Sequence, residues 1–348
     1  MDEESMDIRA ALARISEPAD LSTEEMRAVM RRLMSGEATD AQIGAFLMGM
    51  RLKGETLDEI TGAVMAMREL SRGVTVKGEH VVDIVGTGGD GANLFNVSTA
   101  ASFVVAAGGG RVAKHGNRSV SSNCGSADVL EAAGVTVGLE PEQVAQCVDE
   151  VGVGFMFAPA HHSAMRHAIG PRKELGVRTL FNILGPMTNP AGVRRLLVGV
   201  YDRALCRTVA EVLNRLGAEH VMVVHSADGL DEISLAAVTQ VAEARGGALR
   251  EFEIVPAEVG VEAASLEGLS VGSAAESLEL IRAAMTGDDG DRARRARDLI
   301  ALNAGAALHV AGLADDIATG VASARELLAS GAAWDRLQRL AELTARLA

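Results

Sequence analysis

The chain has 348 residues, of which 48% are hydrophobic and 3% are aromatic, and its formal net charge is -14 at pH 7. A chain of this length can form one large domain or two unequal ones. The negative charge argues against a nucleic acid or an anionic membrane as a partner, because both require a basic surface. The three scattered cysteines are typical of reduced thiols, and the acidic start does not resemble a signal peptide. No stretch of eighteen apolar residues occurs, so we expect a cytoplasmic protein.

The first 72 residues carry helical signals only. Three capping boxes each precede a run of apolar residues with helical spacing, which predicts three helices after a first short one. The boxes pair Ser22 with Glu25, Thr39 with Gln42, and Thr56 with Glu59. Four short helices bury too little surface to be stable alone. We therefore expect a homodimer formed through residues 1–72 and part of 176–190.

From residue 80 onward, short apolar strands alternate with helices, which favours a mostly parallel sheet covered by helices. We expect strands at 81–85, 112–113, 154–158, 196–200 and 221–225, an edge strand at 249–255, and helices at 128–133, 141–151, 202–216 and beyond 273. The predicted fold is α/β, with a small N-terminal helical domain. The expected domains are 1–75, with 176–190 packing back onto it, and an α/β domain of 76–175 and 191–348.

A glycine loop, Gly86 to Gly91 (GTGGDG), follows the first strand and formally fits G-x-G-x-x-G. A dinucleotide-binding fold also needs an acid about twenty residues further on, but no Asp or Glu occurs between Asp90 and Asp128. No Gly-Lys-Ser/Thr follows either, so the loop is not a P-loop. Glycines, hydroxyls and the helix start near Ser98 together favour a diphosphate ligand.

Polar segments also follow two other predicted strands. Lys114 to Ser122 (KHGNRSVSS) follows the second strand, and Asp231 with Glu232 follows the strand at 221–225. In parallel sheets, ligands bind at the carboxyl ends of strands, so these segments should face one crevice. Mg²⁺ prefers a few carboxylates together with substrate phosphates, which the acidic pair would supply. His161, His162 and His167 lack the H-E-x-x-H pattern, which argues against zinc.

The motifs GTGGDG, NVST, KHGNRSVSS and GSADVLEAAG, in this order, resemble those of the anthranilate phosphoribosyltransferases. The segments GFMFAPAHHSAMRHAIGPRKELGVRTLFNILGPMTNP and DGLDE are similar to the same family, so the resemblance covers residues 20 to about 235. It implies an enzyme with a nucleoside phosphorylase/phosphoribosyltransferase-like fold. The enzyme would join phosphoribosyl pyrophosphate to the amine of anthranilate, in tryptophan biosynthesis, and would use two Mg²⁺ ions per active site and no general base.

The resemblance also implies roles for individual residues. Phosphoribosyl pyrophosphate would be bound by Gly86, Gly89, Asp90, Asn96, Val97, Ser98, Thr99, Lys114, His115, Gly116, Asn117, Arg118, Ser119, Val120, Ser121, Ser122 and Ser126. Anthranilate would be bound by Gly86, His115, Asn117, His162 and Arg172. The metal ligands would be Ser98, Asp231 and Glu232.

The sequence departs from the family pattern at two positions. Leu94 stands where the family usually has Thr or Ser, which removes one hydroxyl contact to the diphosphate, and Ala160 replaces a bulkier or more polar residue. Two alternatives stay open. A pyrimidine nucleoside phosphorylase shares the architecture, although NVST and DGLDE disfavour it. A noncatalytic relative that binds nucleic acid would need a basic surface, which this acidic chain lacks.

Overall fold

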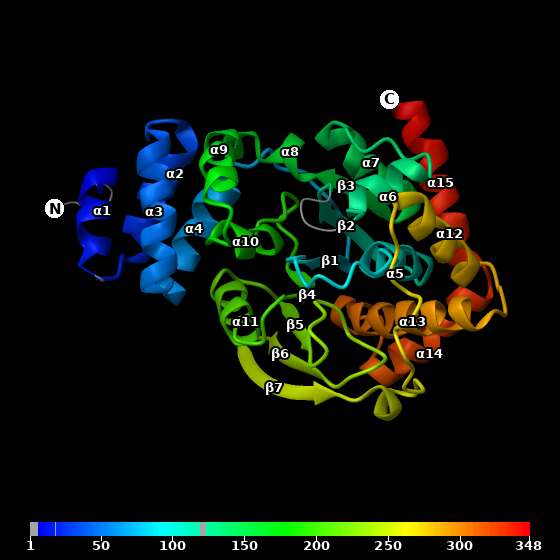
Figure 1. Cartoon of the computed structure of the whole chain (residues 1–348). Helices are drawn as coiled ribbons and strands as arrows, with labels where there is room; N and C mark the ends of the chain where they lie inside the picture. Colours follow the sequence, from blue (N-terminus) through cyan, green and yellow to red (C-terminus); the bar gives the residue numbers. More distant parts are fainter. Residues whose placement is uncertain (1–5, 18, 119–122) are drawn as a thin grey trace. The chain divides into compact units, whose positions relative to one another are not determined.

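The computed structural model describes residues 6–17, 19–118 and 123–348, and Figure 1 shows the order of the elements. The chain divides into two compact units, Met1–Gly73 with Pro159–Gly192, and Val74–Ala158 with Val193–Ala348. The expected division placed 159–175 in the α/β domain, whereas the structure places this segment in the helical unit. The reason is that α9 (Arg166–Leu175) packs on α2 (Thr23–Ser35) and α3 (Asp40–Lys53).

The helical unit contains helices from both of its segments. The N-terminal segment forms α1 (Ile8–Ser16), α2, α3 and α4 (Leu57–Glu69), and the second segment forms η2 (Ser163–Met165), α9, α10 (Phe181–Leu184) and η3 (Gly185–Met187). α8 (Ala158–His161) begins at the boundary between the units. The two segments are joined by several polar contacts. Arg68 Nε donates to Met187 O at 2.8 Å, and Arg72 N donates to His161 O at 2.7 Å.

All three predicted capping boxes are present. Ser22, Thr39 and Thr56 each accept a hydrogen bond from the backbone three residues later, and the side chain at that position bonds back to the cap. Glu59 does more than cap its helix, because it is fully buried and also forms an ion pair with Lys53 at 2.8 Å. Glu59 Oε1 accepts from Leu21 N at 2.9 Å, which fixes the chain before α2.

The second unit is built on a seven-stranded sheet in the order β3-β2-β1-β4-β5-β6-β7. The strands are β1 (Val81–Gly86), β2 (Arg111–Gly116), β3 (Val153–Phe157), β4 (Arg195–Gly199), β5 (His220–Ser226), β6 (Thr239–Arg245) and β7 (Ala248–Ile254). β1 to β5 are parallel, and β6 and β7 add an antiparallel hairpin at the edge. The mostly parallel sheet and the edge strand are confirmed, and β6 is an additional strand.

Helices cover this sheet and bury a continuous apolar core. They are α5 (Val97–Ala107), α6 (Ser126–Ala132), α7 (Pro141–Val151), α11 (Leu205–Arg215), α12 (Ala274–Met285), α13 (Asp291–Ala311), α14 (Ile317–Ala329) and α15 (Ala332–Leu347), with η4 (Pro256–Val259) after β7. α13 packs on β1, β4 and β5, and its residues from Leu299 to Ala311 are all buried. A Cβ on Gly320 would lie 2.2 Å from Gly305 O, so α13 and α14 approach through glycines. Within the described ranges, none of the helices combines the length and apolar character that a membrane crossing requires.

Candidate active site

The carboxyl ends of the parallel strands bring the predicted polar segments of the second unit to one edge of the sheet. β1 ends at Gly86, which pairs with Gly199 at the end of β4, and β2 ends at Gly116. β5 ends at Ser226, shortly before the acidic pair. Because these strands are parallel, the segments that follow them leave the sheet at the same edge. Lys114, His115 and Gly116, which were expected in the loop after the second strand, instead form the end of β2, because they pair with β3.

The glycine loop has a backbone conformation that favours glycine. Gly88, Gly89 and Gly91 have φ values of 65°, 80° and 77°, in the left-handed region. Thr87 anchors the start of the loop on β4, because its N–H donates to Gly199 O at 2.9 Å and its hydroxyl accepts from Tyr201 N at 3.0 Å. The loop is therefore fixed at its start and continues through residues that allow close backbone approach to a ligand.

The acidic pair contacts both the glycine loop and the start of α5. Asp231 Oδ2 accepts from Gly88 N at 2.7 Å, and Glu232 Oε1 accepts from Ser98 N at 3.2 Å. The segment that carries Asp231 passes so close to the ends of β1 and β4 that only glycine fits at those positions. A Cβ on Gly86 would lie 2.4 Å from Asp231 Oδ2, and one on Gly199 would lie 1.6 Å from Asp231 O. Glycines at the ends of β1 and β4 thus make room for Asp231.

Burial and mutual repulsion raise the pKa values of the Asp231 and Glu232 carboxyl groups. Burial, together with the charge of Asp90, raises the pKa of Asp231 to about 6. Burial and the charge of Asp231 raise the pKa of Glu232 to about 8, although Lys114 opposes the shift. A divalent cation would favour the charged forms and reverse both shifts. The residues present therefore fit Mg²⁺.

Lys114 is buried below the start of α5. Its Nζ donates to Ile84 O at 2.5 Å and to Ser98 Oγ at 3.4 Å. Burial lowers the pKa of Lys114, whereas the charges of Asp83 and Glu232 raise it. The next residue, His115, donates its backbone N–H to Asp83 Oδ1 at 3.2 Å. Lys114 therefore lies near the carboxylates of Asp83 and Glu232, and its positive charge partly offsets their negative charge.

The NVST segment forms the first turn of α5, with Asn96 at its N-cap. Asn96 Oδ1 accepts from Ser277 Oγ at 2.7 Å and from Cys124 Sγ at 3.1 Å, and Asn96 N donates to Ser277 Oγ at 3.0 Å. Val97 and Thr99 are buried. Ser277 was not expected from the sequence, because it lies on α12, far along the chain and outside any motif. Only the folded structure brings it to Asn96.

The second polar loop is described in part. Ser119 to Ser122 lie outside the described residues. Asn117 O accepts from Ser126 Oγ and from Ala127 N, both at 3.2 Å, so the loop is tied to the start of α6. Arg118 is directed toward α6, where it pairs with Glu131 and lies over the Phe157 ring at 5.5 Å.

Two residues expected to bind anthranilate belong to the helical unit. Arg172 lies on α9, and its guanidinium is 5.2 Å from the centre of the Phe181 ring. Among the described residues, no carboxylate contributes to the pKa of this guanidinium, which burial lowers. His162 is buried, and burial with the neighbouring His161 lowers the pKa of its imidazole to about 4. His162 is therefore neutral at pH 7, and Arg172 supplies a cation that can pair with an anionic ligand.

Only one compact group of three metal-ligating side chains occurs in the described part of the chain, and it is not part of the expected site. It consists of His220, Glu243 and His309. The histidines at 161, 162 and 167 do not form such a group. Asp90, Asp231 and Glu232 do not enclose an ion alone either, which suits a Mg²⁺ ion completed by water and substrate oxygens.

Comparisons with known proteins agree with this arrangement. Two family models match, the glycosyl transferase family helical bundle domain over residues 9–71 and the glycosyl transferase family a/b domain over residues 78–334. The anthranilate phosphoribosyltransferase of Marinobacter nauticus is 63% identical over 97% of this chain and 99% of its own, and that of Cellvibrio japonicus is 61% identical over the same shares.

Solved structures give the same result. The crystal structure of anthranilate phosphoribosyltransferase from Thermus thermophilus has a TM-score of 0.90 and 43% identity, and the match covers 96% of this chain and 99% of the other. The Saccharomyces cerevisiae enzyme in complex with PRPP and Mg has a TM-score of 0.88 and 25% identity, with both chains fully covered. With near-complete coverage at such identity, and with the glycine loop, α5 and the acidic pair at one edge of the sheet, the chain belongs to the anthranilate phosphoribosyltransferase family.

Proposed function

We propose that this chain transfers the phosphoribosyl group of phosphoribosyl pyrophosphate to the amine of anthranilate, in the cytoplasm, as a step of tryptophan biosynthesis. The products are N-(5-phosphoribosyl)anthranilate and diphosphate. The observation that carries the proposal is the set of contacts joining three segments at one sheet edge, from Asp231 to Gly88 and from Glu232 to Ser98. The relatives' names and the complex of the yeast enzyme with PRPP and Mg support it.

The diphosphate is bound by the glycine loop and the first turn of α5. The backbone N–H groups of the loop and the positive end of the α5 dipole favour an anion. Thr99 Oγ1 is buried without a hydrogen-bond partner among the described residues, so a ligand oxygen would satisfy it. The ribose and its phosphate lie against the segment from Lys114 to Ser122 and against Ser126.

Asp231, Glu232 and Ser98 hold two Mg²⁺ ions in this proposal. Ser98 Oγ already accepts a hydrogen bond from Lys114, and Ser98 N donates to Glu232. Ser98 thus connects Lys114 to the acidic pair. When bound, Mg²⁺ neutralises the charge that develops on the departing diphosphate. The contact of Asp231 with Gly88 N keeps the metal-binding carboxylate and the phosphate-binding loop at a fixed separation.

Anthranilate is held by Arg172 through its carboxylate, and by Asn117, His115, His162 and Gly86. A guanidinium binds a carboxylate in a planar, bidentate way, and Arg172 lies over the Phe181 ring, which restricts its motion. An aromatic amine carries little charge at neutral pH and attacks without prior deprotonation. No general base is required, and the chain's contribution is to align the two substrates at the anomeric carbon.

The metal assignment is tested by the double variant Asp231→Asn with Glu232→Gln. Turnover of anthranilate, followed by its fluorescence, should fall to background at every Mg²⁺ concentration, while circular dichroism stays unchanged. The matched control is Asp289→Asn with Glu262→Gln, which neutralises two exposed acids of the same unit. The control should keep normal turnover. Retained activity in the site variant would show that the acids do not bind the metal.

The proposed assembly is a homodimer formed through residues 1–72 and part of 176–190. The large exposed apolar side chains of the helical unit support this surface, with Leu52 75% exposed and Val177 42% exposed. A subunit interface would cover these side chains, although singly exposed apolar residues also occur on monomers. Leu52→Asp with Val177→Asp should give monomers by sedimentation velocity at micromolar concentration. A wild-type chain that sediments as a monomer would contradict the proposal.

A further inference from the structure

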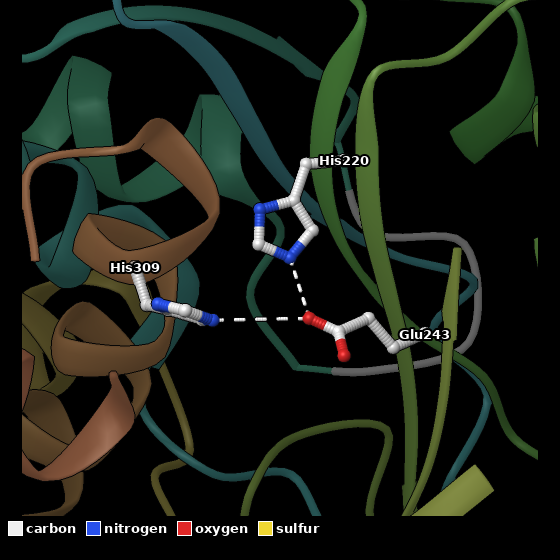
Figure 2. A group of neighbouring side chains, drawn as sticks. All are labelled: His220, Glu243 and His309. Atoms are coloured by element: carbon white, nitrogen blue, oxygen red, sulfur yellow. Dashed lines mark hydrogen bonds and ion pairs between the residues drawn. The ribbon is translucent and has the colours of Figure 1, made fainter. Parts of the chain in front are cut away.

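A buried cluster of two histidines and one glutamate lies in the second unit, away from the site described above. His220 is the first residue of β5, Glu243 lies on β6, and His309 lies on α13 (Figure 2). His220 Nε2 is 2.6 Å from Glu243 Oε1, and His309 Nε2 is 3.8 Å from the same oxygen. The side chains are 2%, 1% and 6% exposed. One ligand atom from each residue lies within 4.8 Å of the others.

The tautomer of His309 is fixed by its surroundings. Its Nδ1 is 3.0 Å from Ala314 O, and a carbonyl oxygen can only accept, so Nδ1 carries a hydrogen. In the neutral ring, Nε2 then presents a lone pair to the carboxylate oxygen of Glu243. At 3.8 Å the two atoms are too far apart for a hydrogen bond, so both are available to a cation placed between them.

The other contacts of Glu243 leave Oε1 directed at the histidines. Oε2 pairs with Nε of Arg250, whose side chain is 66% exposed, so the guanidinium stays largely hydrated. Burial alone would raise the pKa of Glu243, but the hydrogen bonds from His220 and Arg250 outweigh it and hold the pKa below its ordinary range. Glu243 is thus ionised at pH 7 and can serve as a ligand through Oε1.

We propose that His220 Nε2, Glu243 Oε1 and His309 Nε2 bind a divalent transition-metal ion of the Zn²⁺ class. Two imidazoles and one carboxylate form a ligand set that suits Zn²⁺ and is too rich in nitrogen for Mg²⁺. Ala314 O would act as the outer partner that orients a metal-bound histidine. Binding through Nε2 would require the hydrogen that His220 shares with Glu243 to move to Nδ1 of the same ring, so the imidazole stays neutral as a ligand.

This site is separate from the proposed Mg²⁺ site, because the two lie at opposite ends of β5. His220 begins the strand, whereas Asp231 and Glu232 follow its end, about 20 Å away at the usual rise per residue. The ion would join β5, β6 and α13, which come together only through tertiary packing. Its role would be structural, since no expected substrate-binding residue belongs to the cluster.

The test uses the whole wild-type chain, stripped of metal with a chelator and titrated with Co²⁺ without Mg²⁺ or substrates. We expect one tightly bound Co²⁺ per chain, with visible ligand-field absorption and no thiolate charge-transfer band. X-ray absorption of the Zn²⁺-loaded wild type should show nitrogen and oxygen neighbours and no sulfur. Absence of the visible band, or sulfur scattering, would overturn the proposal without any need for a variant.

Variants separate this cluster from the rest of the chain. His309→Gln should weaken Co²⁺ binding by at least about 100-fold, because losing an outer partner alone costs 10- to 100-fold. The control His225→Gln removes another histidine of β5, and Asp231→Asn with Glu232→Gln removes the proposed Mg²⁺ ligands. Both should bind Co²⁺ as the wild type does. If His309→Gln binds Co²⁺ equally well, His309 is not a ligand and the metal assignment is wrong.

Discussion

Asp231 approaches Gly199 so closely that the substitution Gly199→Ala should displace it. The added Cβ would lie 1.6 Å from Asp231 O, which is about 1.8 Å short of the 3.4 Å at which ordinary contact begins. The nearest atoms all belong to the backbone of Asp231, so no side-chain rotation can relieve the clash. The segment that carries Asp231 and Glu232 must therefore move away from β4.

The magnitude follows from the size of this displacement. Misplacing a catalytic group by about 1 Å can cost roughly 100-fold in rate, and the metal ligands would move by more. We expect Gly199→Ala to lower kcat/KM by about 100-fold or more, which corresponds to about 2.7 kcal/mol of transition-state stabilisation. Overpacking should also lower the free energy of unfolding, by about 1–3 kcal/mol.

Steady-state kinetics at several Mg²⁺ concentrations, with thermal unfolding of the same samples, would measure both effects. Gly138→Ala is the matched control, because it also adds one methyl in the second unit but meets nothing within 4 Å. The control should behave as the wild type does. A Gly199→Ala enzyme with kcat/KM within about threefold of the wild type would refute the argument that this glycine positions the acidic pair.

Three further predictions concern Arg172, His162 and the three buried thiols. Arg172→Ala should raise the KM for anthranilate by about 10- to 100-fold, with little change for phosphoribosyl pyrophosphate, whereas Lys173→Ala should change neither. The pKa of His162 falls on folding from 6.5 to about 4, so the unfolded chain binds more protons between these values. Its contribution to stability should be complete above pH 6.5 and be lost as pH falls toward 4, and chemical denaturation of His162→Gln should show a weaker pH dependence. Burial raises the pKa of the thiols to about 11 or 12, so a thiol-specific dye should react far faster with the unfolded chain than with the folded one. These thiols are Cys124, Cys147 and Cys206.

The sequence predicted best what depends on neighbouring residues. Each capping box is a contact across three positions, so Ser22, Thr39 and Thr56 could be assigned without any tertiary information. Most parallel strands were predicted because they are apolar runs, whereas only 112–113 of β2 was predicted, since Arg111, Lys114 and His115 are polar. β6 was missed because it carries Glu243, a charged residue that is buried only because His220 and Arg250 pair with it.

The polar loops of the site could likewise be located, because each follows a strand of the parallel sheet. Long-range contacts could not be predicted. Ser277 reaches Asn96 and Gly199 lies below Asp231, and neither pair shares a motif. The same holds for residues 159–175, whose place in the helical unit depends on packing against α2 and α3.

The helical unit is composed of two segments, and this has a consequence for how the chain folds as it leaves the ribosome. Residues up to Gly73 are made first, but the second segment, whose helices α9 and α10 pack on α2, α3 and α4, ends 119 residues later at Gly192. At 5–20 residues per second, the delay is roughly 6 to 24 seconds. During this time the nascent helices α1 to α4 lack their final partners, so a chaperone that binds apolar helices should bind here. A fragment ending at Gly73 should remain in the same incomplete state.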